Sequence, residues 1–363
     1  MTEPNKYNSL SNYLFIAAAI VFIVWGISQA QSVLAAFLVS VFLAVLAMPP
    51  VLWLEGKRIP VVVAVLIVVA GMIIILLAIG VVVGTSISSF YAALPEYQAR
   101  IQEQVTSLKV FLAGKHMAPP EKLLSEYINP GAVMNLTVNL FVWLGSAFSN
   151  IVLIVLTVMF ILLEAKSFPI KLRGVLGDPL QVFPRFTRFV DDMKRYIVIK
   201  TLISLVTGVL VAIWLFILHV DFPVLWGFLA FLLNYVPSLG STIAGIPAVL
   251  LAFVQFGIWR AILVATGYIV INLALDYGVE KRLMGRKLGL STLVVFLSLI
   301  FWGSLLGPIG AVLCIPLTMT LKFAFESSER TRWISFLLGP ENQTENIPRT
   351  LEKEIQSRDS KIT

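Results

Sequence analysis

The sequence predicts an all-α polytopic membrane protein with about six spanning helices, two oppositely oriented re-entrant helical hairpins and a periplasmic or extracellular amphipathic segment. Hydrophobic residues make up 58% of its 363 residues and charged residues only 13%, whereas soluble domains have about 45–50% and about 25%. The mean hydropathy is +0.92. The apolar residues form long runs separated by short basic segments, a pattern typical of membrane helices and their cytoplasmic loops.

The same composition excludes several classes of protein. Cys314 is the only cysteine, so no disulfide forms within the chain, and the two histidines, His116 and His219, lack cysteine partners at zinc-ligand spacing. The net charge of +7 comes from residues beside apolar runs, which argues against nucleic acid as a partner. No nucleotide-binding loop, metalloprotease helix or hydrolase elbow occurs. We therefore expect no enzyme, no cofactor, no metal and a lipid bilayer as the main surroundings.

Six apolar segments are close to the roughly 20 residues that cross a bilayer. They are Leu14–Ser28, Val33–Leu54, Val61–Thr85, Leu140–Leu163, Tyr196–Leu218 and Trp259–Tyr277. The first could instead be a signal peptide cleaved near Ser28–Ala30. Because only Lys6 precedes it and a second apolar run follows at once, an uncleaved helix is favoured.

Two further segments, Phe222–Phe256 and Leu290–Phe325, contain about 35 residues each and as single helices would be roughly 50 Å long. Gly/Pro breaks interrupt them at 237–240 and 307–310. If both are re-entrant hairpins, the first entering from outside and the second from the cytoplasm, every strongly basic segment falls in the cytoplasm, as membrane proteins prefer. Those segments are 57–58, 166–200, 281–287 and the C-terminal tail. The alternative is eight simple crossings with 281–287 outside.

This topology places both termini in the cytoplasm and divides the chain into five parts. Between the third and fourth crossings, apolar positions from Leu94 to Leu112 recur every three or four residues until Gly114, which predicts an amphipathic helix. That helix packs on its own membrane domain or joins neighbouring protomers. The parts are 1–85 (three spanning helices), 86–139 (periplasmic segment), 140–221 (two spanning helices with a cytoplasmic amphipathic helix at 167–195), 222–325 (transport unit with hairpins 222–256 and 290–325) and 326–363 (largely disordered tail).

Polar residues beside the breaks are the candidate substrate-binding residues, because irregular backbone at membrane depth normally lines a cavity. Packing or helix-bridging hydrogen bonds are the alternative role for each of them. Asp276 is a candidate for ion coupling, or a solvated carboxylate near the membrane surface. The substrate-binding candidates are Asn234, Pro237, Ser238, Gly240, Ser241, Thr242, Asn272, Trp302, Gly303, Ser304, Gly307, Pro308 and Gly310.

Two runs carry a family resemblance. Residues 234–247, NYVPSLGSTIAGIP, and residues 283–316, LMGRKLGLSTLVVFLSLIFWGSLLGPIGAVLCIP, resemble the AI-2E family, the autoinducer-2 exporter superfamily. The second run especially resembles the enterobacterial autoinducer-2 exporters of that family. The resemblance covers nearly the whole chain in segment order and is specific from about Phe222 to Glu326. One departure is the stretch from Asp276 to Glu280, where we expect an Asn- or Glu-rich stretch.

The resemblance implies an inner-membrane secondary transporter that exports a small polar solute such as autoinducer-2, with or without an ion gradient. It further implies an elevator-like hairpin domain and a homo-oligomer, a pentamer in particular. Because some members are described as sodium or lithium/proton antiporters, antiport is one alternative function, and proton and sodium are the candidate coupling ions. A membrane scaffold that transports nothing is the other alternative.

Overall fold

The computed structural model describes residues 18–19, 21–114, 150–165, 182–237, 240–284, 289–326 and 331–339, with single positions between 138 and 174. Every regular element in these ranges is helical, as the sequence predicts. Several predicted features lie wholly or partly outside the described residues. They are residues 115–137 of the periplasmic segment, the start of the fourth crossing, most of positions 167–181 of the predicted helix 167–195, Ser238, and the tail beyond 339.

Within the described residues, five helical stretches are long and apolar enough to cross a membrane: Gln31–Gly56, Val61–Arg100, Phe186–Ile217, Ile258–Glu280 and Thr292–Val312. The first four coincide with predicted crossings. The fifth lies in the segment predicted as the second hairpin. Of the predicted fourth crossing, the structure describes α6 (Ile151–Glu164), which is 14 residues long.

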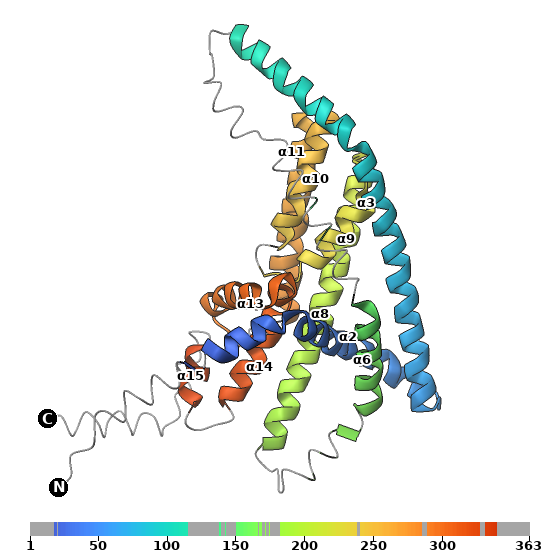
Figure 1. The fold of residues 1–363 in the computed structure, drawn as a ribbon, viewed down its shortest axis with the longest axis vertical. Coiled ribbons are helices and arrows are strands. Elements are labelled where there is room, and N and C mark those ends of the chain that lie inside the picture. Colours follow the sequence, from blue (N-terminus) through green and yellow to red (C-terminus); the bar gives the residue numbers. More distant parts are fainter. Residues whose placement is uncertain are drawn as a thin grey trace, which may run out of the picture.

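Helix α3 (Val61–Gly114) contains 54 residues and is therefore about 80 Å long. Figure 1 shows it running along the other helices and projecting past one end of them. A bilayer core is only about 30 Å thick, so much of this helix lies outside it. The predicted spanning segment and the described part of the periplasmic segment, which meet at residue 85, are one continuous helix that includes Pro95 and is described as far as Gly114.

Helices α2 (Gln31–Gly56), α3 and α6 share one apolar core around Val65 and Val158. A second core joins α8 (Val182–Ile217) to α9 (Pro223–Leu233), α10 (Gly240–Phe256), α11 (Ile258–Asn272) and the middle of α3. The outward faces remain apolar: Phe216 and Trp259 are 72% and 79% exposed. Such a surface is stable in lipid and unfavourable in water.

Helix α8 contains 36 residues without a break, so the predicted amphipathic helix does continue into the following span. It packs tightly on α9 through two glycines. A Cβ atom on Gly208 would lie 2.7 Å from the Gly227 carbonyl oxygen, and one on Gly227 would lie 2.6 Å from that of Gly208. Small residues commonly allow membrane helices to approach this closely.

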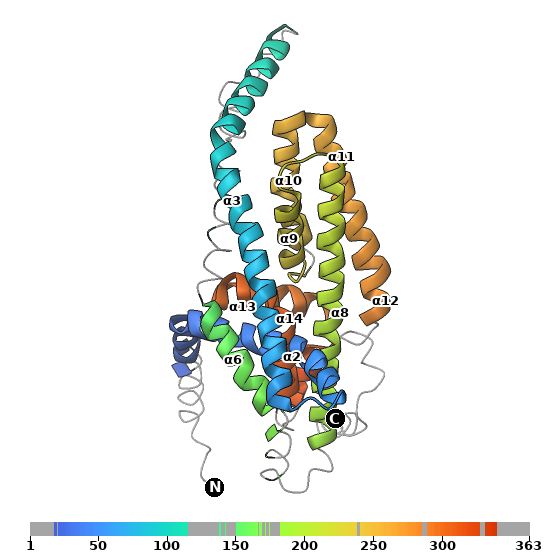
Figure 2. The same ribbon diagram turned by 90° about the vertical axis from the view of Figure 1, so that its right-hand side faces the viewer.

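The chain reverses direction between α9 and α10. Figures 1 and 2 show α9 returning along α8 from the end where α3 projects, and α10 leading back to that end. The 11 residues of α9 extend about 16 Å, half the thickness of a bilayer core. Helices α9 and α10 therefore form a helical hairpin, and its re-entrant placement in the membrane stays a prediction.

Helix α13 (Thr292–Val312) is interrupted by Gly307, whose φ and ψ are 66° and −155°. Helix α14 (Cys314–Glu326) then packs against α13, and α15 (Arg332–Leu337) against α14. The straight part of α13 before the break has 15 residues, fewer than a crossing needs. The kink therefore explains why a stretch apolar enough to cross need not act as a single span.

Candidate transport site

The turn between α9 and α10 is attached to α8 by side-chain hydrogen bonds. The Asn234 side chain, 3% exposed, donates from Nδ2 to Ser204 Oγ at 3.0 Å. The Tyr235 hydroxyl donates to Thr201 Oγ1 at 2.8 Å. Asn234 thus has the helix-bridging role that the sequence left open beside substrate binding.

The remaining candidates at this turn differ in exposure. Pro237 is half-buried, Ser241 is buried and Thr242 is exposed, whereas Ser238 is outside the described residues. Gly240 has no room for a side chain, because a Cβ atom there would lie 1.6 Å from the Leu233 carbonyl oxygen. The turn is therefore compact, and Thr242 offers the accessible hydroxyl among these residues.

The break in α13 has its own polar contacts. The Trp302 indole Nε1 donates to Thr318 Oγ1 at 3.0 Å, and Thr318 donates to Ser298 Oγ at 2.8 Å, which ties α13 to α14. Exposed Ser304 donates to the Phe301 carbonyl. A Cβ on Gly310 would lie 2.0 Å from the Trp302 carbonyl oxygen, whereas one on Gly303 would meet only Ala311 at 3.7 Å. Trp302 and Gly310 therefore have clear packing roles, and the exposed Pro308 directly follows the kink.

The two breaks contact different parts of α2. Tyr235 packs edge-on against Phe42 at 5.5 Å between ring centroids, while a Cβ on Gly307 would lie 2.7 Å from Gln31 Nε2. Gln31 and Phe42 are 11 residues apart, about 16 Å along a helix. In the described residues no hydrogen bond links positions 234–242 to positions 302–310, so a common site made of both tips stays a prediction.

A buried ion pair lies beside the first turn. Lys200, near the start of the apolar run of α8 and 5% exposed, bonds Glu280 Oε2 at 2.9 Å and Oε1 at 3.1 Å. A buried ammonium without an ionic partner is strongly destabilising, so such a residue needs a partner. Lys200 falls at the end of the predicted basic cytoplasmic segment 166–200, so the sequence did not predict this ion pair. The available signal was the spacing of Lys200, Ser204 and Thr207 on one helical face of an apolar run.

Glu280 ends η1 (Leu273–Glu280), a π-helical continuation of α11, and π-helical turns are frequent at functional sites. Asp276 lies in the same element, half-buried, and the charges of Lys200 and Glu280 both act on it. Asn272, at the end of α11, has its Oδ1 atom buried without a hydrogen-bond partner in the described structure. Asp276, the predicted coupling residue, is thus influenced by the charges of Lys200 and Glu280.

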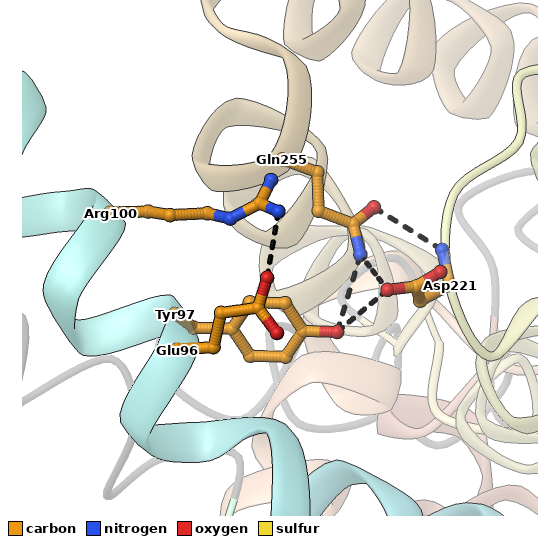
Figure 3. A network of polar contacts seen from close by, with 5 residues as sticks. All are labelled: Glu96, Tyr97, Arg100, Asp221 and Gln255. Atoms are coloured by element: carbon orange, nitrogen blue, oxygen red, sulfur yellow. Dashed lines mark hydrogen bonds and ion pairs between the residues drawn. The ribbon is translucent and has the colours of Figure 1, made fainter.

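A second polar network lies at the opposite end of the helix pair and links it to α3 (Figure 3). The Tyr97 hydroxyl donates to Asp221 Oδ2 at 2.7 Å, and the Gln255 amide donates to both. The Asp221 backbone N–H in turn donates to Gln255 Oε1 at 3.2 Å. On the same turn of α3, Arg100 pairs with Glu96 at 2.7 Å. Sequence analysis assigned no role to Tyr97, Asp221 or Gln255.

Within the described residues, no group of three or more His, Cys, Asp or Glu side chains has the arrangement of a metal site. The chemistry that these two networks support is hydrogen bonding and charge compensation inside an apolar helical body. Both kinds of interaction are what a membrane carrier of polar solutes uses.

Comparison with known proteins agrees with this reading. A family model described as AI-2E family transporter matches residues 12–330. The AI-2 transport protein TqsA of Escherichia coli K12 is 38% identical over 324 residues, covering 89% of this chain and 94% of TqsA. The putative transport protein YhhT of the same strain is 33% identical and covers 96% and 100%. A putative transport protein of Haemophilus influenzae is 34% identical and covers 91% and 97%. The chain therefore belongs to the AI-2E transporter family and is a multi-pass membrane transport protein.

Proposed function

We propose that the protein exports a small polar solute across the bacterial inner membrane by alternating access, with autoinducer-2 as the first substrate to test. The observation that supports this most is the turn between α9 and α10. It connects two short helices inside an apolar core and is held to α8 by hydrogen bonds from Asn234 and Tyr235. The TqsA relative, named as an AI-2 transport protein, supports the choice of substrate.

In this proposal α9 and α10 form a re-entrant hairpin whose tip contacts the solute. Thr242, backbone groups of the turn and the residues of the α13 break contribute polar contacts. The basic segments at the α2–α3 connection and at the start of α8 lie at the same end of the molecule (Figures 1 and 2). We place that end, and with it both termini, in the cytoplasm because positive loops favour that side.

Alternating access requires the transport unit, residues 222–325, to move against the scaffold formed by α2, α3 and α6. The two bodies contact each other through few polar groups, chiefly Tyr97 with Gln255, and Tyr97 also bonds Asp221 in the turn that leads into the unit. We propose an elevator-like displacement of that unit within a homo-oligomer, a pentamer by family resemblance.

The test is uptake of autoinducer-2 into sealed everted vesicles, with empty-vector vesicles as the control. Accumulation that depends on a proton or sodium gradient supports a coupled exporter, and saturable equilibration without a gradient supports a facilitator. Uptake equal to that of the control vesicles contradicts export of this solute.

A second candidate is sodium (or lithium)/proton antiport, favoured by the charged cluster of Lys200, Asp276 and Glu280. The same vesicles, loaded with a pH-sensitive dye, distinguish it. Proton release on addition of sodium or lithium chloride, but not of choline chloride, supports antiport.

A further inference from the structure

The carboxylates beside α8 form an arrangement that an inorganic cation would also fit. Glu280 places both oxygens on the Lys200 ammonium, at 2.9 and 3.1 Å. Asp276, four residues earlier, feels the charges of both. Two ionised carboxylates and one ammonium have a net charge of −1. Without the ammonium, the two carboxylates would repel each other with no positive charge to compensate them.

Oxygen atoms without partners lie in the same region. Tyr196, one turn before Lys200 on α8, is 4% exposed, and its hydroxyl has no hydrogen-bond partner in the described structure. Glu280 lies close enough for its charge to act on that hydroxyl. Asn272 Oδ1, one turn before Asp276, is unpartnered as well. Buried polar atoms normally have partners, so these two oxygens indicate a site with more ligands than the lysine uses.

We propose that the Lys200 ammonium is a built-in cation that occupies a monovalent-cation site formed by Glu280 and Asp276, and thereby excludes sodium and lithium. Hard monovalent cations and an ammonium compete for the same carboxylate, amide and hydroxyl oxygens. The ammonium is attached to α8, so its local concentration exceeds that of any free ion. Replacing it with an uncharged side chain of similar length should open the site.

The inference rests on the proposed export function and argues against the antiport candidate, since a site occupied by the Lys200 ammonium would not exchange sodium or lithium. Its test needs no transported solute. Purified full-length protein in detergent is unfolded by heat in sodium, lithium, potassium or choline chloride at equal ionic strength. Unfolding is followed through the fluorescence of its 8 tryptophans. The wild-type unfolding temperature is expected to be equal in all four salts.

Lys200→Met is expected to unfold at a lower temperature in choline chloride and to gain about 2–4 °C in sodium or lithium chloride, because a ligand that binds only the folded state stabilises it. Lys200→Met combined with Glu280→Gln should fold without this gain, since it removes one carboxylate. Lys171→Met, which removes the exposed pair with Glu164, is the matched control and should behave like the wild type.

Three results would overturn the inference. One is a sodium- or lithium-specific shift in the wild-type protein. Another is a folded Lys200→Met variant that unfolds at the same temperature in sodium, lithium and choline chloride. The third is a Lys200→Met variant that is not monodisperse in any of the four salts although the double variant folds. That result would mean that sodium does not replace the ammonium. If Lys200→Met is monodisperse only when purified in sodium or lithium chloride, the inference is supported. A negative result in the autoinducer-2 uptake experiment would not change the interpretation of these unfolding measurements.

Discussion

The Tyr97 hydroxyl donates a 2.7 Å hydrogen bond to Asp221 Oδ2 and so joins the long helix α3 to the turn between α8 and α9 (Figure 3). Asp221 directly precedes the proposed transport unit, whereas α3 is part of the proposed scaffold. Trp226, fully buried, donates its indole N–H to the Asp221 carbonyl at 3.0 Å, which fixes the turn. In the proposed mechanism, this contact lies where the moving unit would separate from the scaffold.

Tyr97→Phe should weaken that connection. It removes one hydrogen bond and leaves the ring packed, so we expect a loss of about 1 kcal/mol, measured as a lower unfolding temperature in detergent. Tyr91→Phe, on the same helix and exposed, is the control and should change nothing. Equal unfolding temperatures for both variants would show that the Tyr97 bond does not stabilise the fold.

Glu280→Gln should be among the most destabilising single changes, because it leaves the buried Lys200 ammonium without its ionic partner. Breaking one side of a buried pair costs about 3–5 kcal/mol. The double variant Lys200→Met, Glu280→Gln should recover most of the loss, because neither charge remains. Additive losses in a double-mutant cycle of unfolding temperatures would contradict a direct coupling between the two residues.

Asn234→Ala and Ser204→Ala both remove the 3.0 Å hydrogen bond between α8 and the turn. If Asn234 is purely structural, the two variants should reduce uptake equally. If Asn234 also contacts the solute, we expect Asn234→Ala to raise the apparent KM several-fold more than Ser204→Ala. Concentration-dependent uptake into everted vesicles, corrected for the amount of protein, separates the two roles.

Gly307→Ala should disturb the break in α13, because backbone at φ 66° and ψ −155° is open almost only to glycine. The expected loss is about 1–3 kcal/mol, and the added methyl also meets Gln31. Gly303→Ala, where the methyl would have space, is the matched control. We expect slower uptake and a lower unfolding temperature for Gly307→Ala alone; wild-type values for it would contradict a functional break.

Asp276→Asn should alter the gradient dependence of transport, because it removes a half-buried carboxylate on which the charges of Lys200 and Glu280 act. The measurement is uptake with and without proton and sodium gradients. An unchanged gradient dependence and an unchanged pH profile would exclude a coupling role for Asp276 and leave it as a solvated carboxylate.

Much of the architecture follows from the sequence alone. Runs of apolar residues determine where helices cross, since no other arrangement satisfies the backbone in lipid. The stretches that contain α2 and α11 begin and end near the predicted positions, α3 begins at the predicted Val61, and α8 ends next to the predicted Leu218. The Gly/Pro breaks at 237–240 and 307–310 could also be predicted from the sequence. The conformational freedom of glycine, the fixed φ of proline and its missing N–H group act within a few residues.

The tertiary structure decided which polar groups meet. Lys200 and Glu280 are 80 residues apart and Tyr97 and Gln255 are 158 apart, and no local rule links them. Their pairing depends on how closely α8, α9 and α11 pack, as at Gly208 and Gly227. Lys200 looked like a loop charge because hydropathy averages over a window, whereas its burial depends on a partner that only the folded chain supplies.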